Sequence, residues 1–186
     1  EDALAYTAGV TSSIWGVDDR FDQFLLRGFD LGTYGIYRDG LQQKSLNFTG
    51  FKTDPWMVER IDVLKGPAGV MYGETDPAGV INIVTKRPRF DGDFAEAFAS
   101  WGSHDTGTVG ADAGKVSEDG TLALRLTGLA RDGANQTGGS QNDRLLLAAA
   151  LGWRPDEDTE ITILGHVQKD RLTPNGFFPV AGEDYD

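Results

Sequence analysis

The stretch "IDVLKGPAGVMYGETDPAGVINIVTKRP", residues 61–88, places two apolar, β-branched runs on either side of a glycine-rich centre. The runs 61–64 and 80–84 have the composition of strands. Because glycine weakens a strand, its repeated use indicates tight turns and close approach of backbone segments. Pro67 and Pro77 would stiffen those turns. We therefore expect two closely packed strands with a small core, and turns at the glycines of positions 66, 69, 73 and 79.

The composition excludes several classes of protein. The 186 residues include 17 basic and 29 acidic side chains, a net charge of −12, which argues against a nucleic-acid-binding surface. The absence of cysteine excludes disulfides and thiolate metal sites. No run of 18 apolar residues predicts a transmembrane helix, whereas a transmembrane β-barrel hides its apolar residues in alternation.

The part of the chain before residue 88 combines short strands, small helices and long connections. Pro55 suits the first turn of a helix and Asp54 suits its cap, so a helical turn is expected there. We expect a short helix over residues 1–10 and strands over residues 24–30, 34–41, 60–64 and 79–86.

After residue 88 the sequence alternates over segments of roughly ten residues, the length that a tilted transmembrane strand needs. In residues 121–131, leucines at 122, 124 and 126 alternate with Ala123, Arg125 and Thr127. Residues 144–154 and 160–170 alternate similarly, with Leu147 and Leu151 on one face, and 94–101 and 107–116 do so more weakly. Short charged connections ("SEDG", "PDED") alternate with a long one over residues 132–143, which is typical of an outer-membrane barrel. Trp101 and Trp153 would lie in its aromatic girdles. A soluble β-sandwich also alternates and remains an alternative.

The ordered series "RGF", "DGL", "ERIDVLKGP", "MYG" and "PAGVINIVTKRP" resembles the plug domain of TonB-dependent outer-membrane receptors, most closely those for ferric siderophores. One departure is Lys65, where the family usually has arginine; lysine keeps the charge but loses the bidentate fork. The resemblance implies an α/β plug domain over residues 1–88, truncated at its N-terminus. It also implies that residues 89–186 are the first strands, about five, of a 22-stranded transmembrane β-barrel truncated at its C-terminus.

The same resemblance implies a function. Such a receptor lies in the outer membrane of a Gram-negative bacterium, binds an iron(III)-siderophore and imports it with energy supplied by TonB. The TonB box would precede this sequence and is missing from it. The partners would thus be the ferric siderophore, TonB and outer-membrane lipid. Iron would be held by the siderophore, so neither a protein cofactor nor protein metal ligands are expected.

The resemblance also nominates site residues. The family binds its chelate at the outward apex of the plug, which corresponds here to Arg27, Gln42, Gln43 and Trp56, with Phe48 and Phe51 as weaker candidates. A guanidinium and amide donors suit an oxygen-rich, anionic chelate, and an aromatic wall suits its apolar backbone. As alternatives, Arg27 would shape its turn and Trp56 would pack in the plug core. The resemblance implies that three charged residues pair with charges of the barrel wall: Glu59, Arg60 and Lys65. The alternative is that they form a solvated charge cluster.

Enzymatic activity finds little support. The sequence contains no GxSxG, HExxH or Walker A pattern, and "GPAGVMYG" lacks the spacing of a dinucleotide-binding loop. His104 and His166 lie far apart in the sequence and are not expected to bind a metal. Three alternatives remain open: a TonB-dependent receptor for another nutrient, such as cobalamin or a glycan; a soluble β-rich binding module; and a carbohydrate-active enzyme.

Overall fold

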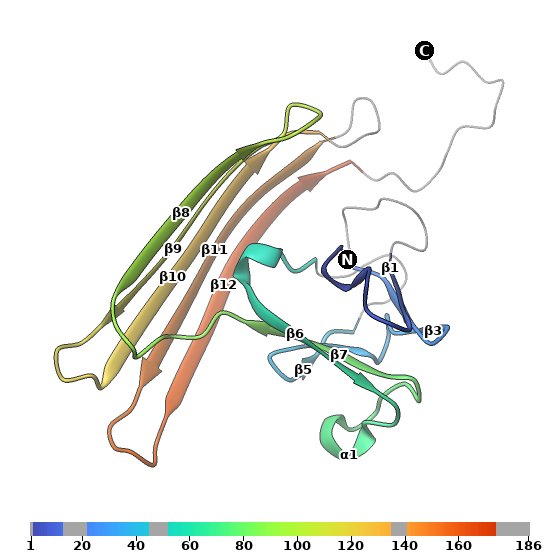
Figure 1. Cartoon of the computed structure of the whole chain (residues 1–186), viewed down its shortest axis with the longest axis horizontal. Helices are drawn as coiled ribbons and strands as arrows, with labels where there is room; N and C mark the ends of the chain where they lie inside the picture. The colour runs from blue at the N-terminus through green and yellow to red at the C-terminus, as the bar shows by residue number, and fades with distance from the viewer. Residues whose placement is uncertain (1, 13–21, 45–51, 135–140, 174–186) are drawn as a thin grey trace.

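The computed structural model describes residues 2–12, 22–44, 52–134 and 141–173. Their strands form three sheets of three, four and five strands. In Figure 1 the five-stranded sheet is a tall, curved layer, and the two smaller sheets form a compact body beside its concave face. We call the smaller sheets with their helices the inner body, and the tall layer the wall sheet.

The inner body contains both small sheets. The first is antiparallel and follows a 3₁₀ turn η1 (Asp2–Leu4), with strands β1 (Val10–Ser12), β2 (Phe24–Leu26) and β3 (Phe29–Asp30). The second has the order β5-β4-β7-β6, in which only the β4–β7 pair is parallel. Its strands are β4 (Ile36–Arg38), β5 (Leu41–Gln42), β6 (Val58–Lys65) and β7 (Gly79–Thr85). A 3₁₀ turn η2 (Pro55–Met57) precedes β6, and a short helix α1 (Gly69–Tyr72) follows it.

Strand β7 is the core of the inner body, because all seven of its residues are buried. Val80 and Ile81 are fully enclosed and pack in the two apolar clusters of this body. Gly79 has φ +134°, and a Cβ there would collide with the carbonyl oxygen of Leu64 on β6. The glycine-rich stretch therefore serves close approach of backbone to backbone, as its sequence predicts.

Two predicted strands are wrong in the same way. Residues 24–30 form the hairpin β2–β3, and residues 34–41 belong to the hairpin β4–β5. In each hairpin a two-residue turn has positive φ at both positions: Arg27 (52°) with Gly28 (86°), and Asp39 (52°) with Gly40 (81°). Positive φ at both central residues is the geometry of a type I′ turn, for which Asp-Gly is a strong signal. The turns were hidden by the apolar residues around them.

The helical content is small. The helix expected over residues 1–10 is limited to η1 and is followed by β1, so that part of the prediction is also wrong. The turn at Pro55 is confirmed, and the Asp54 carboxylate accepts a hydrogen bond from the Trp56 amide at 2.9 Å. Strands β6 and β7 are confirmed, while α1 was not predicted. The inner body is thus an α/β unit made mainly of strands.

The wall sheet is antiparallel throughout, with the order β12-β11-β10-β9-β8. Its strands are β8 (Phe94–Trp101), β9 (Gly107–Val116), β10 (Leu122–Asp132), β11 (Asn142–Trp153) and β12 (Ile161–Leu172). The predicted alternation is confirmed: Leu124 is 42% exposed on the outward face, whereas Arg125 and Thr127 are 8% and 2% exposed on the inward face. Trp101 and Trp153 lie at opposite ends of the sheet, since one pairs with Gly107 and the other with Leu122. Among the described residues, no helix is long and apolar enough to cross a bilayer.

Candidate functional site: the contact between the inner body and the wall sheet

A buried carboxylate marks the centre of the contact. Asp112 on β9 is completely buried on the inward face of the wall sheet. Arg125 of β10 donates to both of its oxygens, from Nε at 3.0 Å and from Nη2 at 2.8 Å, and the Thr127 hydroxyl donates at 3.0 Å. The fourth donor group comes from the inner body: Lys86 Nζ lies 2.6 Å from Oδ2. A buried charge is tolerated when it is paired and hydrogen-bonded on all sides, as here.

Besides Asp112, the ring of Trp56 holds Lys86 in place. Lys86 follows the last residue of β7, and its ammonium lies 3.9 Å from the centre of the Trp56 ring, a cation–π contact. Trp56 itself packs on the wall: its ring meets Phe98 edge to face at 4.6 Å, and its Nε1 donates to the Ala111 carbonyl at 3.3 Å. The inner body thus contacts the wall through an apolar ring beside a charge.

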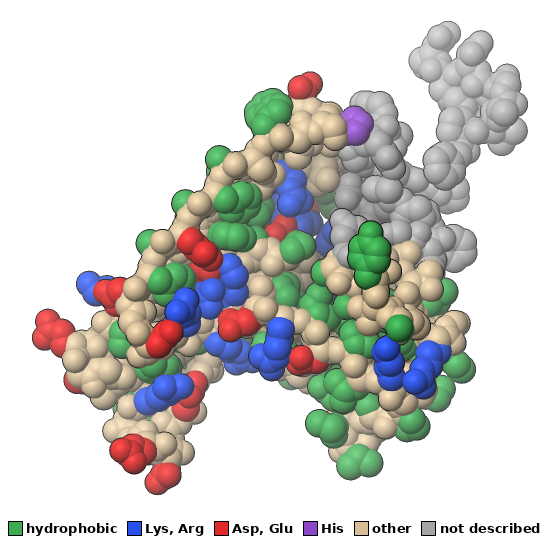
Figure 2. Space-filling model, in the orientation of Figure 1, with side chains coloured by type: hydrophobic (Ala, Val, Ile, Leu, Met, Phe, Trp, Pro, Cys, Tyr) green, Lys and Arg blue, Asp and Glu red, His purple; other side chains and the backbone are tan. Residues whose placement is uncertain are grey.

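Arg125 links this centre to further charges. Its Nη1 donates to the Glu59 carboxylate at 3.3 Å and to the Arg87 carbonyl at 3.0 Å. Glu59 also accepts from the Arg87 amide at 3.1 Å, and the Arg87 side chain donates to Asp39 at 3.1 Å. Figure 2 shows acidic and basic side chains intermixed where the inner body meets the wall sheet.

A second contact lies nearer the end of the wall sheet that carries Trp101. Asp54, which caps η2, accepts from Arg144 Nη1 of β11 at 2.8 Å, and both side chains are 1% exposed. Arg144 also forms a fork with Asp170 of β12, at 2.8 and 3.1 Å. The amide of Gln168 donates to the Lys52 carbonyl at 3.1 Å. One guanidinium therefore joins two wall strands to the start of η2.

The three residues nominated for wall contact have different positions. Glu59 contacts Arg125, as described. Arg60 is 61% exposed and pairs with Asp62 of its own strand at 3.2 Å. Lys65 makes no ion pair within the described part of the chain. Of the nominated charges, the structure brings only Glu59 to the wall.

The residues nominated for ligand are not gathered in one place. Arg27 is exposed at the β2–β3 turn. Gln42 uses its amide inside the inner body, donating to Tyr34 O, Tyr37 Oη and Glu74 O at 3.0–3.3 Å. Gln43 donates to Leu41 O at 3.2 Å, and Trp56 packs on the wall. Phe48 and Phe51 lie outside the described residues. Arg27 is the nominated ligand residue whose charged group is presented to solvent.

Sequence reasoning missed four residues of the contact: Lys86, Asp112, Asp54 as an ion-pair partner, and Arg144. A signal for two of them exists, because a charged residue at an inward position of a wall strand must face a partner rather than lipid. Asp112 and Arg144 occupy such positions. Nothing in the sequence pattern pairs either one with its partner on the inner body.

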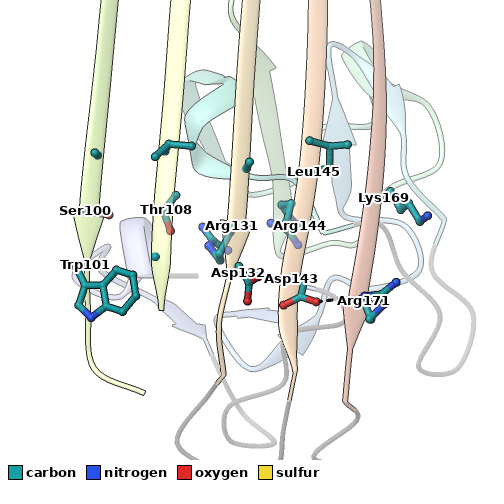
Figure 3. Close-up of a pocket in the computed structure, with 14 residues that line it drawn as sticks. Ser100, Trp101, Thr108, Arg131, Asp132, Asp143, Arg144, Leu145, Lys169 and Arg171 are labelled. Atoms are coloured by element: carbon teal, nitrogen blue, oxygen red, sulfur yellow. Dashed lines mark ion pairs between the residues drawn. The ribbon is translucent and has the colours of Figure 1, made fainter. Parts of the chain in front are cut away.

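A separate groove of about 760 Å³ lies on the outward face of the wall sheet, near the end that carries Trp101. Figure 3 shows Trp101, Asp132, Asp143 and Arg171 around it, with the Asp143–Arg171 pair at 3.7 Å. These side chains alternate along their strands with the inward-facing Arg131 and Arg144. Arg131 and Arg144 also line the groove, so the groove adjoins the contact at Asp54.

Comparison with known proteins finds one family of outer-membrane receptors. Residues 1–80 match the family described as TonB-dependent Receptor Plug Domain. The ferrichrome outer membrane transporter/phage receptor of Escherichia coli K12 is 33% identical over 186 residues, covering 98% of this chain and 25% of that protein. The ferrioxamine receptor of Yersinia enterocolitica is 36% identical over 185 residues, covering 96% and 25%.

Solved structures show the same fold. The ferric-catecholate import receptor Fiu of E. coli K12, in its closed form, matches with a TM-score of 0.82 and 27% identity, over 96% of this chain and 25% of that one. The pyoverdine receptor FpvA of Pseudomonas aeruginosa matches with a TM-score of 0.80 and 21% identity, over 91% and 25%, and so supports the fold alone. The chain spans about a quarter of these relatives. It belongs to the TonB-dependent outer-membrane receptors, with the inner body as their plug and the wall sheet as part of their barrel.

Proposed function

We propose that this chain is the plug and part of the barrel of a receptor that binds an iron(III)-siderophore and imports it with energy from TonB. The relatives named for ferrichrome and ferrioxamine, and the structural neighbour named for ferric-catecholate import, support this ligand class. No protein cofactor or catalytic group is part of the proposal, because the iron arrives inside its chelate. We place the boundary between plug and barrel at Pro88, in the connection between β7 and β8.

The observation that carries the proposal is the polar nature of the contact between plug and wall. Lys86–Asp112, Glu59–Arg125 and Asp54–Arg144 cross this contact. An import receptor needs a plug that closes the barrel and yet can move. Ion pairs meet both needs, since water and other acceptors can replace each partner once the plug shifts, whereas a single broken pair leaves a costly buried charge.

We further propose that Arg27 contacts the anionic chelate. Its guanidinium is exposed and makes no ion pair among the described residues. Trp56, Gln42 and Gln43 would shape the plug below the ligand through the contacts already described, with Phe48 and Phe51 as further candidates. Arg60 and Lys65, which do not reach the described wall, would contact barrel strands beyond it.

The test is uptake of ⁵⁵Fe-labelled ferrichrome, ferrioxamine B and a ferric catecholate by cells whose only siderophore receptor is the full-length protein. We expect uptake of at least one chelate, abolished by deletion of TonB or by a protonophore. Binding of none of them, together with growth support by cobalamin or a glycan, would assign the receptor to another nutrient. Uptake that persists without TonB would overturn the energetic part of the proposal.

A further inference from the structure

A cavity of about 340 Å³ lies between the plug and the inward face of the wall. Arg38, at the end of β4, lines it from the plug side, and Thr162, Leu164 and His166 of β12 line it from the wall side. Arg125 pairs with Ala150, which pairs with Leu164, whereas Asp112 pairs with Thr127. The cavity thus extends from the level of the Lys86–Asp112 contact towards the end of the sheet with the short charged connections.

Arg38 differs from the other cations around this cavity. Lys86, Arg87 and Arg125 each have a carboxylate partner, in Asp112, Asp39 and Glu59. The Arg38 guanidinium makes no hydrogen bond or ion pair in the part of the chain that the structure describes.

Among the described residues that line the cavity, the only carboxylate is that of Asp39. The adjacent Asp39 is occupied by the Thr85 amide and hydroxyl, at 2.9 and 2.7 Å, and by Arg87. The residues of β12 that line the cavity are threonine, leucine, glycine and histidine, so this strand offers no carboxylate there.

A half-buried guanidinium without an acceptor is unfavourable. Arginine keeps its charge in proteins and presents five donors in a fixed fork. Burial lowers the pKa of Arg38, and the neighbouring Asp39 only partly opposes this. An oxygen anion would stabilise this guanidinium, because a guanidinium binds such an anion with two parallel hydrogen bonds.

We propose that Arg38 is an oxyanion-binding residue of the plug, and that in the whole receptor its cavity holds one carboxylate or phosphate-like group. Two sources have this chemistry. One is an inward-facing carboxylate on a barrel strand beside β12, whose second edge has no partner among the described strands. The other is a free anion that enters the lumen. The inference depends on the fold and its charges, and it holds whichever nutrient the receptor imports.

The experiment uses the full-length receptor in detergent, in a buffer that contains chloride but no phosphate. Thermal unfolding is followed with and without inorganic phosphate for the parent, Arg38→Gln and Arg38→Lys. Arg171→Gln is the matched control, because Arg171 is an exposed arginine on the outward face of β12, the strand whose inward face lines the cavity.

A free anion predicts that phosphate raises the unfolding temperature of the parent and of Arg171→Gln saturably, with half-saturation weakened at least about tenfold in Arg38→Gln. A wall carboxylate predicts no effect of phosphate, but an unfolding equilibrium of Arg38→Gln shifted about tenfold or more towards the unfolded state, with partial recovery in Arg38→Lys. Either result supports the oxyanion role. If phosphate has no effect and Arg38→Gln is as stable as the parent, or more stable, the proposal is wrong.

Discussion

Lys86 Nζ lies 2.6 Å from Oδ2 of Asp112, so a plug residue supplies one of the four donors around a completely buried wall carboxylate. The other three donors come from the wall itself. The wall alone can therefore supply three of the four hydrogen bonds to Asp112. If the plug leaves, however, Lys86 loses its carboxylate partner. This asymmetry makes the two partners unequal in mutagenesis.

We expect Asp112→Ala to cost about 3–5 kcal/mol of receptor stability, because it leaves Arg125 and Lys86 buried without their common partner. Lys86→Met should cost less and should act mainly on plug retention. Retention can be measured as entry of large antibiotics into cells that produce the receptor. The matched control is Lys115→Met, since Lys115 is an exposed lysine on the outward face of the same wall strand. Equal entry for Lys86→Met and Lys115→Met would show that Lys86 does not hold the plug.

Arg144→Ala should destabilise the receptor by about 3–5 kcal/mol, because it removes the fork on Asp170 and leaves the buried Asp54 with only Arg131, whose Nη2 lies 3.5 Å away. Arg144→Lys should retain only part of this stability, since an ammonium cannot form the fork with Asp170 and also reach Asp54. The free energy of unfolding in urea provides the measurement. Arg171→Ala is the control: this side chain is 67% exposed and 3.7 Å from Asp143, so its loss should cost less than about 1 kcal/mol. Similar losses for both arginines would contradict the assigned geometry.

Leu147→Arg should destabilise the receptor in a bilayer by about 2–4 kcal/mol, because Leu147 is 58% exposed on the outward face at the middle of β11. Gln168→Arg lies at nearly the same depth, since Gln168 pairs with Leu146, but faces the lumen and should cost much less. Refolding into lipid vesicles measures both. The reverse order would mean that the lipid-facing side has been assigned to the wrong face.

Arg27→Ala should weaken chelate binding roughly ten- to hundred-fold, which corresponds to the loss of a charge-assisted hydrogen bond of ~1.5–3 kcal/mol. Arg27→Lys should recover part of the affinity. Binding is measured on purified receptor, with Arg60→Ala as the control and heat-modifiable gel migration as the check on folding. Unchanged affinity in a folded Arg27→Ala receptor would restrict Arg27 to shaping its turn.

Asp76→Asn should stabilise the plug at neutral pH. Its Oδ2 is buried and has no hydrogen-bond partner, and burial, followed by the charge of Asp30, raises the pKa of Asp76. A raised pKa means that folding favours the protonated form. This stabilising contribution is complete below the ordinary pKa and is lost as the pH rises through the raised value. Unfolding of the parent and the variant is compared across that range, with the exposed Glu118→Gln as the control. A variant that is less stable than the parent at pH 7 would show that the ionised carboxylate is needed.

Much of the fold follows from local patterns. The alternation of Leu122, Leu124 and Leu126 with Arg125 predicts both the strand β10 and its two faces, because a strand has a period of two. Asp54 before Pro55 predicts η2 through the chemistry of a helix start. The sequence does contain a signal for the β4–β5 turn, the pair Asp39-Gly40, which the strand interpretation passed over. In the β2–β3 turn only Gly28 favours a left-handed conformation, and Arg27 does not.

The contact between plug and wall could be predicted only in part. Glu59 was nominated and reaches Arg125, yet Arg60 and Lys65 on the same strand do not reach the described wall. Which charge reaches which partner depends on the register of β9 against β10 and on the place where β7 ends. These are long-range relationships: Lys86 and Asp112 are 26 residues apart, and Asp54 and Arg144 are 90 apart. No local pattern in a single sequence determines which of these distant residues pair.

Gly79 has a mechanical consequence for the far end of its strand. Because no Cβ fits between Gly79 and Leu64, any substitution there would wedge β7 away from β6. The same two strands carry Glu59 and lead to Lys86, roughly 20 Å away along the strand direction. A methyl group added at Gly79 would therefore also displace the other end of β7. There the Lys86 ammonium must lie within hydrogen-bond distance of Asp112. A substitution of Gly79 would therefore disturb the contact between Lys86 and Asp112, although Gly79 itself packs against Leu64 and Leu26 of the inner body.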